Sequence, residues 1–468
     1  MVERLGIPTA TLVGSGFAVQ AENSVDGLGF ERLPLAIFPG PHPNQQSYEE
    51  LKNGVLNVTV DQVIEALTVD LAPAQKASGE PKPEEIVFTG SFEEVNEFWH
   101  RNKWSEGLPV IPPTIEAVRQ FLKFTDRKPT EMLGVLLCDQ REATVWNVAV
   151  NGVMAGCRPE YMPILLAIVE AIADPGFGIE HSGNTPGVES LVVLNGPIIE
   201  QLGFNSAQGV LRDGIRPNTS IGRFYRLYMR NVAGFILHET DKGTLGSSFR
   251  VILPENHDVL ASLGWQPLAA DLGFKADDNV VMVGGYTGSE TVAHIAGTNA
   301  EQVMSYISEV TRWIAGNWHI VFTWHISVGT TRHLVVLSPL IAEIIAKSGW
   351  DKARVRQYLF DHARIPAWQQ EQILCHWMMG KNENNQLLNG VKEGRLPKVF
   401  AESEDPNRMV PIVCKPEDFM IGVAGAPGQK HAHVFAQNGF INYPTAKKIQ
   451  LPAKWNELLS KTQGPKAG

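Results

Sequence analysis

The chain has 468 residues, of which 44% are hydrophobic and 19% charged, and its formal net charge is −10 at pH 7. This length allows two or three domains with large cores. A negatively charged chain without a basic run is not suited to binding a nucleic-acid backbone. No apolar run reaches the roughly 18 residues that cross a bilayer. We therefore expect a cytoplasmic protein that binds neither nucleic acid nor membrane.

The four cysteines, Cys138, Cys157, Cys375 and Cys414, lie far apart in the sequence. They form neither a CxxC motif nor the Cys/His spacing of a metal site. The N-terminus also lacks a cationic segment followed by an apolar stretch, as in secretion signals. These features predict free thiols in a reducing cytoplasm.

Residues 1–70 are predicted to form a small, partial α/β domain. The strands are TATLV and LPLAIFPG, and the helices lie around VQAENSVDGL and VTVDQVIEAL. The chain opens on ERLGIPTA, which has the pattern of a last helical turn because Gly6 suits the left-handed position after a helix and Pro8 prevents continuation. We expect that the strand and helix preceding this turn are missing, which leaves a sheet edge to be covered.

Residues 71–88 are predicted to be a linker, because LAPAQKASGEPKPEE has no apolar periodicity. Residues 89–468 alternate strand-like runs with helical periods, which predicts a large α/β domain with a layered parallel or mixed sheet.

Three segments of the large domain share one pattern of strand, proline, amphipathic helix and a closing Gly-aromatic pair. They are VVLNGPIIEQLGF, VILPENHDVLASLGW and VVLSPLIAEIIAKSGW. Proline suits the first turn of a helix and glycine its end. The pattern indicates either an internal repeat or three instances of a common α/β joint.

The segment WNVAVNGVMAGCRPEY places Cys157 just before Pro159 at the start of a predicted helix. The helix N-terminus and the adjacent Arg158 favour a partly accessible thiolate, so we predict Cys157 to be the catalytic residue, with Arg158 and Asn151 binding substrate. The alternative is a small residue buried where glycine-flanked backbone packs closely.

The segment GNWHIVFTWHISVGTTRH contains several histidines and aromatic residues. We predict that His325 transfers a proton and that Arg332 holds an anion, while His319, Trp324 and His333 line the substrate pocket. Satisfied core histidines and a metal site are the alternatives.

Two further patterns suggest polar chemistry. His431 and His433 lie two residues apart in HAHVF and are able to chelate a metal ion together. Glu106 lies on the Gly-Pro-rich loop WSEGLPVIPPT, where we predict a proton-transfer role. The segment NTSIGRFYRLYMRN has arginines at spacings of three and four, which either hold a carboxylate or form a solvated helix face; they are Arg223, Arg226 and Arg230.

Six stretches together resemble the UGSC-motif (seleno)protein family. They are GIPTATLVGSGF, LPLAIFPGPHP, EGLPVIPPT, VNGVMAGCRPEYMPILLA, VVLNGP and NTSIGRFYRL, and AGCRPEY is the most specific part. The resemblance covers most of the chain. It implies a redox motif, selenocysteine or cysteine followed by Gly-Ser-Cys, at the start of the helix that ends in GIPT. A similar order occurs in the selenoprotein B component of glycine and proline reductases. Since this chain lacks the motif, the resemblance implies that it lies upstream of Met1 or on a small partner subunit.

The predicted function is thiol- or selenol-dependent reduction or cleavage of a carbon–heteroatom bond in a small organic substrate. An external thiol is the expected donor, and a hetero-oligomer with the redox subunit is the expected assembly. We also expect Cys157, Trp324 and His325 to share one pocket. The alternatives are a metal-assisted hydrolase or lyase that uses the histidines, and a non-catalytic scaffold subunit of a redox complex.

Overall fold

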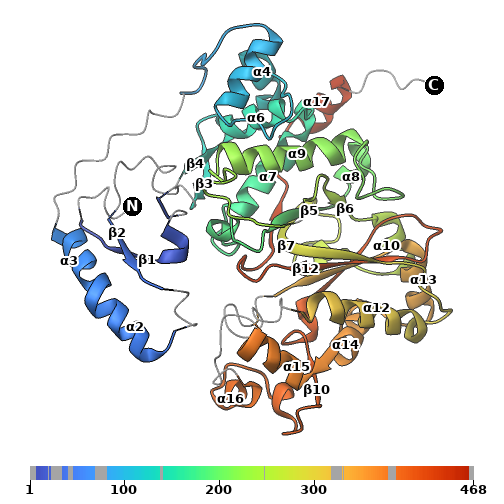
Figure 1. Ribbon diagram of the computed structural model, residues 1–468. Coiled ribbons are helices and arrows are strands. Elements are labelled where there is room, and N and C mark those ends of the chain that lie inside the picture. The colour runs from blue at the N-terminus through green and yellow to red at the C-terminus, as the bar shows by residue number, and fades with distance from the viewer. Residues whose placement is uncertain are drawn as a thin grey trace.

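The computed structural model confirms the predicted α/β class (Figure 1). It describes residues 7–18, 21–22, 34–40, 46–68, 82–137, 141–246, 248–317, 329, 331–377 and 386–462. Within these residues, none of the helices combines the length and apolar character needed to span a bilayer.

The N-terminal unit contains two parallel strands and a long interrupted helix. Its elements are β1 (Thr11–Gly14), β2 (Leu35–Phe38), α2 (Tyr48–Gly54) and α3 (Val60–Thr68), with a π-helical turn joining α2 to α3. Gln62 of α3 accepts a hydrogen bond from the Ile37 amide at 2.5 Å, which ties the helix to β2. Both predicted strands are confirmed. The helix begins earlier than predicted because Ser47 and Glu50 form a capping box. The helix predicted at VQAENSVDGL lies largely outside the described residues.

The remaining helices and strands alternate along the chain, as predicted for a layered α/β fold. In the first half they are α4 (Phe92–Arg101), α5 (Ile115–Leu122), β3 (Met132–Leu136), β4 (Arg141–Thr144), α6 (Val145–Met154), α7 (Met162–Ile172), β5 (Glu189–Asn195), α8 (Ile198–Gln201), α9 (Arg216–Asn231), β6 (Leu253–Pro254), α10 (His257–Leu263), α11 (Leu268–Asp271), β7 (Val280–Val292) and α12 (Ala300–Ala315). In the second half they are β8 (His333–Leu337), α13 (Pro339–Lys347), α14 (Lys352–His362), β9 (Arg364–Pro366), α15 (Ala367–Gln372), α16 (Leu387–Lys392), β10 (Met409–Pro411), β11 (Phe419–Val423), β12 (Ala432–Gln437), β13 (Thr445–Lys448) and α17 (Trp455–Thr462).

The main sheet has seven strands in the order β11-β8-β12-β7-β5-β6, with β13 beside the first part of β7. The pairs β11–β8 and β5–β6 are parallel, and the other pairs are antiparallel. The sheet is therefore mixed, which is one of the two predicted forms.

The two halves of this sheet have the same topology. One half contains β5, β6 and β7, and the other contains β8, β11 and β12. In each half the first strand is parallel to the second and antiparallel to the third, and the third strands, β7 and β12, pair at the centre of the sheet. The proline-punctuated segments after β5 and β8 therefore occupy equivalent places, whereas the segment after β6 does not. The topology supports a twofold internal repeat rather than a threefold one.

The two ends of the sheet come together. The Asn256 amide, just beyond β6, donates to the Val423 carbonyl of β11 at 2.8 Å. Alternate residues of six strands form one buried cluster, which includes Leu191, Met282 and Phe435. One sheet face thus surrounds a shared interior, because β6 and β11 close the sheet around it.

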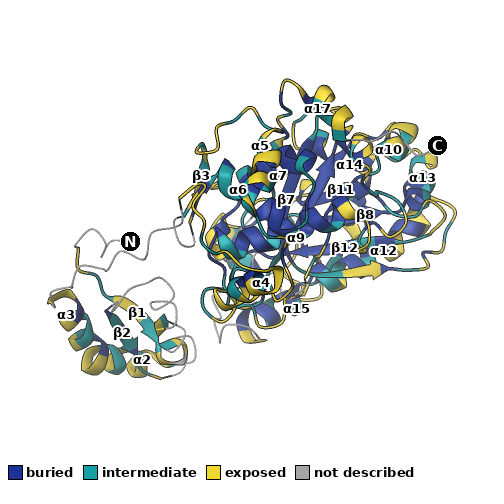
Figure 2. Ribbon diagram, turned by 90° about the horizontal axis from the view of Figure 1, so that it is seen from above, coloured by how far each residue is buried: buried dark blue, intermediate teal, exposed yellow. Residues whose placement is uncertain are grey.

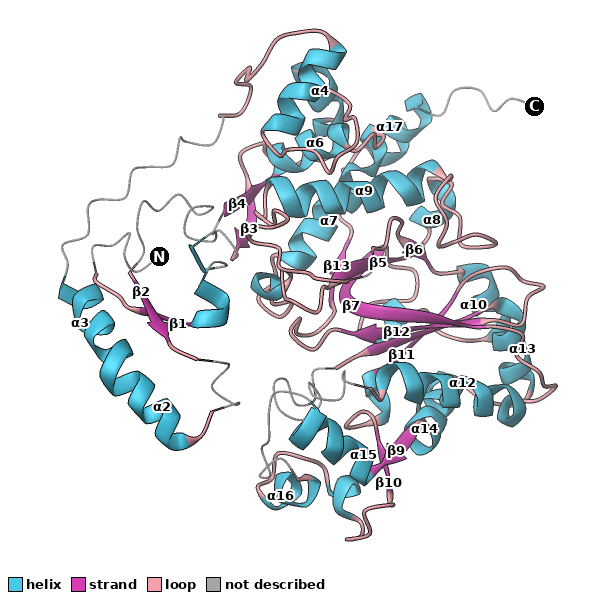
Figure 3. Ribbon diagram, viewed as in Figure 1, coloured by secondary structure: helices cyan, strands magenta, loops and turns pink. Residues whose placement is uncertain are grey.

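Two groups of helices cover the outer face. The outer residues of β5 and β7 share a core with α6, α7 and α9, while those of β8, β11 and β12 share another with α12, α13 and α14. Figure 3 shows these helices on opposite sides of the strands. Figure 2 shows that the strands between them are buried, whereas the N-terminal unit is mostly half-buried or exposed.

Candidate functional site

Helix α9 carries the row of arginines that the sequence singled out, and it lies over β5 (Figure 1). Its apolar residues, among them Ile221, Phe224 and Leu227, are fully buried against the helical layer. The Tyr225 hydroxyl donates to the Ser190 hydroxyl at 2.7 Å and so fixes the helix to the start of β5. Because the apolar face of α9 is packed against the core, the arginines lie on the opposite, half-buried face of the helix.

Two of the three arginines form no ion pair with a carboxylate among the described residues. Arg226 donates to the Ser248 hydroxyl, and Arg230 Nη1 donates to the Lys103 carbonyl at 3.4 Å. Neither guanidinium forms an ion pair with any residue in the described part of the chain. Burial lowers the pKa of Arg230, against the opposing effects of Glu106, Asp241 and Glu239, and the adjacent Arg226 adds to the lowering. A partly buried, unpaired cation is unfavourable, so the pair is suited to receive an anion.

The third arginine brings Glu106 to the same helix face. Arg223 Nε bonds Glu106 Oε1 at 2.5 Å, and Arg223 Nη2 donates to the Pro109 carbonyl at 2.7 Å. The Glu106 side chain is only 13% exposed. Its second oxygen, Oε2, is buried and has no hydrogen-bond partner among the described residues. Glu106 therefore retains a free acceptor next to the arginine row.

Glu189, the first residue of β5, is a further acidic group that the sequence did not point out. Burial raises its pKa to about 7, although Arg226 opposes this shift. The loop that carries Asp241 packs beside this part of the chain, since a Cβ added at Gly187 would lie 2.6 Å from the Gly246 backbone. We call Arg223, Arg226, Arg230, Glu106 and Glu189 the α9 site.

Cys157 lies near the N-terminal end of α9 but is not the accessible thiolate that we predicted. It precedes the short helical turn that leads into α7, as expected, but it is only 6% exposed and belongs to the hydrophobic core. Burial raises the pKa of its thiol to about 12, despite the opposing effects of Ser220, Arg216 and Arg223. The expectation was wrong because desolvation outweighs both the helix terminus and the nearby cations.

Arg158 and Asn151 are engaged with other protein groups. Arg158 Nε pairs with Glu160 Oε1 at 2.6 Å. Asn151 donates to the Asn147 carbonyl at 2.9 Å and accepts from Asn231 Nδ2 at 2.9 Å, so it links α6 to α9. Their predicted role in substrate binding stays a prediction.

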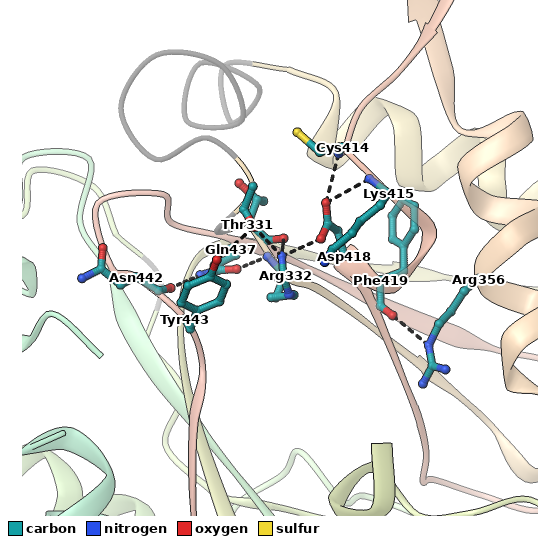
Figure 4. A network of polar contacts seen from close by, with 11 residues as sticks. Thr331, Arg332, Arg356, Cys414, Lys415, Asp418, Phe419, Gln437, Asn442 and Tyr443 are labelled. Atoms are coloured by element: carbon teal, nitrogen blue, oxygen red, sulfur yellow. Dashed lines mark hydrogen bonds and ion pairs between the residues drawn. The ribbon is translucent and has the colours of Figure 1, made fainter. Parts of the chain in front are cut away.

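Arg332 lies in a separate polar network, which Figure 4 shows from close by. Its Nη1 bonds Asp418 Oδ1 at 2.6 Å, and its guanidinium lies 4.9 Å from the centre of the Tyr443 ring. The adjacent His333 is fully buried and accepts from the Gln437 amide at 3.2 Å. None of these three partners belongs to the α9 site, so these contacts do not join Arg332 and His333 to it.

Asp418 and Cys414 are the members of this network that sequence reasoning missed. Asp418 Oδ2 accepts from the amides of Cys414 and Lys415 at 3.0 and 3.1 Å, and burial raises the pKa of its carboxyl to about 6. Burial likewise raises the pKa of the Cys414 thiol to about 12. The segment KPED does not by itself indicate the contact between Asp418 and Arg332, because the two residues are 86 positions apart in the sequence.

The remaining predicted residues come from the two histidine-containing segments. His319, Trp324 and His325 lie outside the described residues. His433 Nδ1 shares a 3.0 Å hydrogen bond with Thr291 Oγ1, and burial lowers the pKa of His433 to about 4. His431 stacks edge-on against His294 at 5.6 Å. The described residues contain no group of three His, Cys, Asp or Glu side chains that is arranged to hold a metal ion.

Comparison of this chain with protein-family models, curated proteins and solved structures finds no match in any of the three.

Proposed function

We propose that this chain binds a small organic carboxylate at the α9 site, as the substrate-binding part of an enzyme that uses a thiol or selenol to reduce or cleave a carbon–heteroatom bond. The observation that carries the proposal is the pair Arg226 and Arg230, which are half-buried, one turn apart and without an ion pair in the described residues. A carboxylate bound there offsets the cost of burying both cations.

The chemistry needs two sulfur or selenium groups, and the burial of Cys157 favours a source outside the α9 site. One group attacks carbon and displaces the heteroatom, and the second attacks the first to form a disulfide or selenosulfide. In the net reaction, two thiols and a carbon–heteroatom bond are converted to a disulfide, a carbon–hydrogen bond and the protonated leaving group. A partner that carries a Cys/Sec-Gly-Ser-Cys motif, recharged by an external thiol, supplies both groups.

Anion binding is tested by calorimetric titration of the whole chain with acetate, malonate and inorganic phosphate. We expect binding of the carboxylates, and a loss of about 10- to 100-fold in affinity for Arg226→Gln and Arg230→Gln, since hydrogen bonds between charged groups contribute about 1.5 to 3 kcal/mol. Arg312→Gln is the matched control, because Arg312 pairs with Glu309 on α12. Carboxylate affinity that is unchanged in both α9 variants, or preferred binding of phosphate, would contradict the proposal.

The source of the thiol is tested with Cys157→Ser. We expect turnover of α-substituted carboxylates, assayed with the motif-bearing partner and a dithiol, to persist in this variant. Loss of turnover with carboxylate binding intact would return the nucleophilic role to Cys157.

A non-catalytic scaffold subunit is the second candidate, and the buried, apolar surroundings of Cys157 favour it. It predicts that neither carboxylates nor phosphate bind at the α9 site.

A further inference from the structure

A cavity of about 220 Å³ lies between three segments of the large domain that are far apart in the sequence. They are residues 125–127 in the loop between α5 and β3, one face of α7, and residues 450–452 between β13 and α17. The lining residues of α7 are three or four positions apart, so they lie on one side of the helix. They are Pro163, Leu166, Ala167 and Glu170. None of the lining residues belongs to the α9 site, so the cavity is a separate place in the fold.

Carboxylates outnumber cations in the walls of this cavity. Arg127 Nη1 bonds Glu170 Oε1 at 2.6 Å, and Arg127 Nε bonds Glu131 Oε1 at 2.8 Å, so two carboxylates share one guanidinium. Asp126 Oδ2 accepts from the Ala453 amide at 2.7 Å, and Asp126 forms no ion pair within the described part of the chain. The excess of negative charge favours a positively charged ligand.

One oxygen of each lining carboxylate receives no hydrogen bond from the described residues. In Glu170 this oxygen is Oε2, because Arg127 bonds only Oε1. In Asp126 it is Oδ1, because the Ala453 amide bonds Oδ2. A primary ammonium group carries three N–H donors and no acceptor, which matches such oxygens.

The floor of the cavity is apolar, whereas its carboxylates lie nearer to solvent. Leu166 is 3% exposed, Ala167 is 1% exposed and Pro163 is also buried, while Glu170 is half-buried and Asp126 is exposed. A buried apolar cavity of about 150 Å³ takes up benzene, so a volume of about 220 Å³ has room for about nine non-hydrogen atoms. A ligand that fits this arrangement has an apolar chain at one end and a positive charge at the other.

We infer that this cavity binds a small alkylammonium ion. The ammonium group donates to Asp126 and Glu170, and the alkyl chain packs on Pro163, Leu166 and Ala167. Burying the chain removes apolar surface from water, and the two carboxylates offset the cost of partly burying the cation. An organic anion would meet two like charges, so the cavity selects for charge in the opposite sense to the α9 site.

Calorimetric titration of the whole chain at pH 7 with n-hexylamine, 1-hexanol and ethylamine tests the inference. Both amines are protonated at this pH, as a lysine side chain is. The alcohol has the same chain as n-hexylamine without the charge, and ethylamine has the charge with a short chain. We expect n-hexylamine to bind at least about tenfold more tightly than either of the other two.

Three variants locate the amine. Asp126→Asn and Glu170→Gln each remove one negative charge at nearly constant side-chain size, and we expect each to weaken n-hexylamine binding by about tenfold or more. Ala167→Leu places a larger side chain at the floor, and we expect it to abolish binding because the alkyl chain loses its space. Glu457→Gln on α17 is the matched control, since Glu457 pairs with Lys461 and does not line the cavity.

Two results would overturn the inference. If n-hexylamine bound no more tightly than 1-hexanol, or did not bind at all, the carboxylates would not select a cation. If its affinity were unchanged in both Asp126→Asn and Glu170→Gln, or in folded Ala167→Leu, the amine would bind elsewhere. The two charge variants decide the question alone if Ala167→Leu does not fold.

Discussion

Asp418 is the buried carboxyl whose effect on stability follows most directly from the structure. It is 1% exposed, and burial raises its pKa from 3.8 to about 6. Because the folded state holds this proton more tightly than the unfolded state, stability falls as pH rises through the window between about 4 and 6 and is then constant for this group.

We expect this contribution to amount to roughly 3 kcal/mol, since each pKa unit corresponds to about 1.36 kcal/mol. Urea unfolding of wild type and Asp418→Asn between pH 4 and 7 measures it, because the asparagine variant lacks the titration. The difference in unfolding free energy between the two proteins should shift in favour of the variant as pH rises. A difference that stays constant over this range would show that the pKa of Asp418 is not raised.

Residue-scale chemistry was the least predictable part of the candidate site. Glu106 and the α9 arginines were chosen from loop composition and helical spacing, and the structure brings Glu106 and Arg223 into contact. The sequence could not show that Cys157 is buried, because its burial depends on core residues from elsewhere in the chain, such as Phe204 and Ile221 of the same hydrophobic cluster.

At the scale of single elements, helix α9 contains Gly222 in its interior. Alanine at such a position ordinarily makes a helix about 1 kcal/mol more stable than glycine does. A Cβ at this position would lie 2.5 Å from the Arg250 carbonyl oxygen and 2.8 Å from the Val251 Cα. These atoms belong to the backbone that leads into β6, so the close approach of α9 to this segment requires glycine.

We therefore expect Gly222→Ala to lower the free energy of unfolding by about 1 to 3 kcal/mol, as overpacking commonly does. Gly288→Ala is the matched control, because a Cβ at Gly288 meets no atom within 4 Å. Chemical denaturation measures both variants. Equal stability of Gly222→Ala and wild type would mean that the backbone around Arg250 moves aside easily.

Boundaries of elements were predictable where local signals decide them. Pro339 opens α13, and Gly264 closes α10 in the left-handed conformation with a φ of 68°, both as the proline and glycine punctuation predicts. The start of the helix at Tyr48 was missed because the capping box of Ser47 was not recognised. Pairing between distant strands leaves no comparable local signal.

For the whole molecule, the α/β class followed from the alternation of strands and helices, but closure of the sheet did not. The sequence could not reveal it, because the residues that meet between β6 and β11 are far apart in the chain, with Glu255 and Val423 168 positions apart. Glu255, which is 1% exposed, holds this junction. Its carboxylate accepts from Asn195 Nδ2 at 2.7 Å, from the Leu268 amide at 2.8 Å and from the Val423 amide at 3.1 Å.

Glu255→Gln tests whether this carboxylate joins the two halves of the repeat. The amide group places a donor where the carboxylate only accepts, so at least one of the three hydrogen bonds is lost in a buried site. We expect the free energy of unfolding to fall by about 2 to 4 kcal/mol. Hydrogen exchange should also quicken at Val423, whose amide loses its acceptor, and at Asn256 beside it. Glu309→Gln, a surface change in α12, serves as the control. If exchange at Val423 and Asn256 were unchanged while stability fell, the closure of the sheet would depend on its shared apolar interior rather than on Glu255.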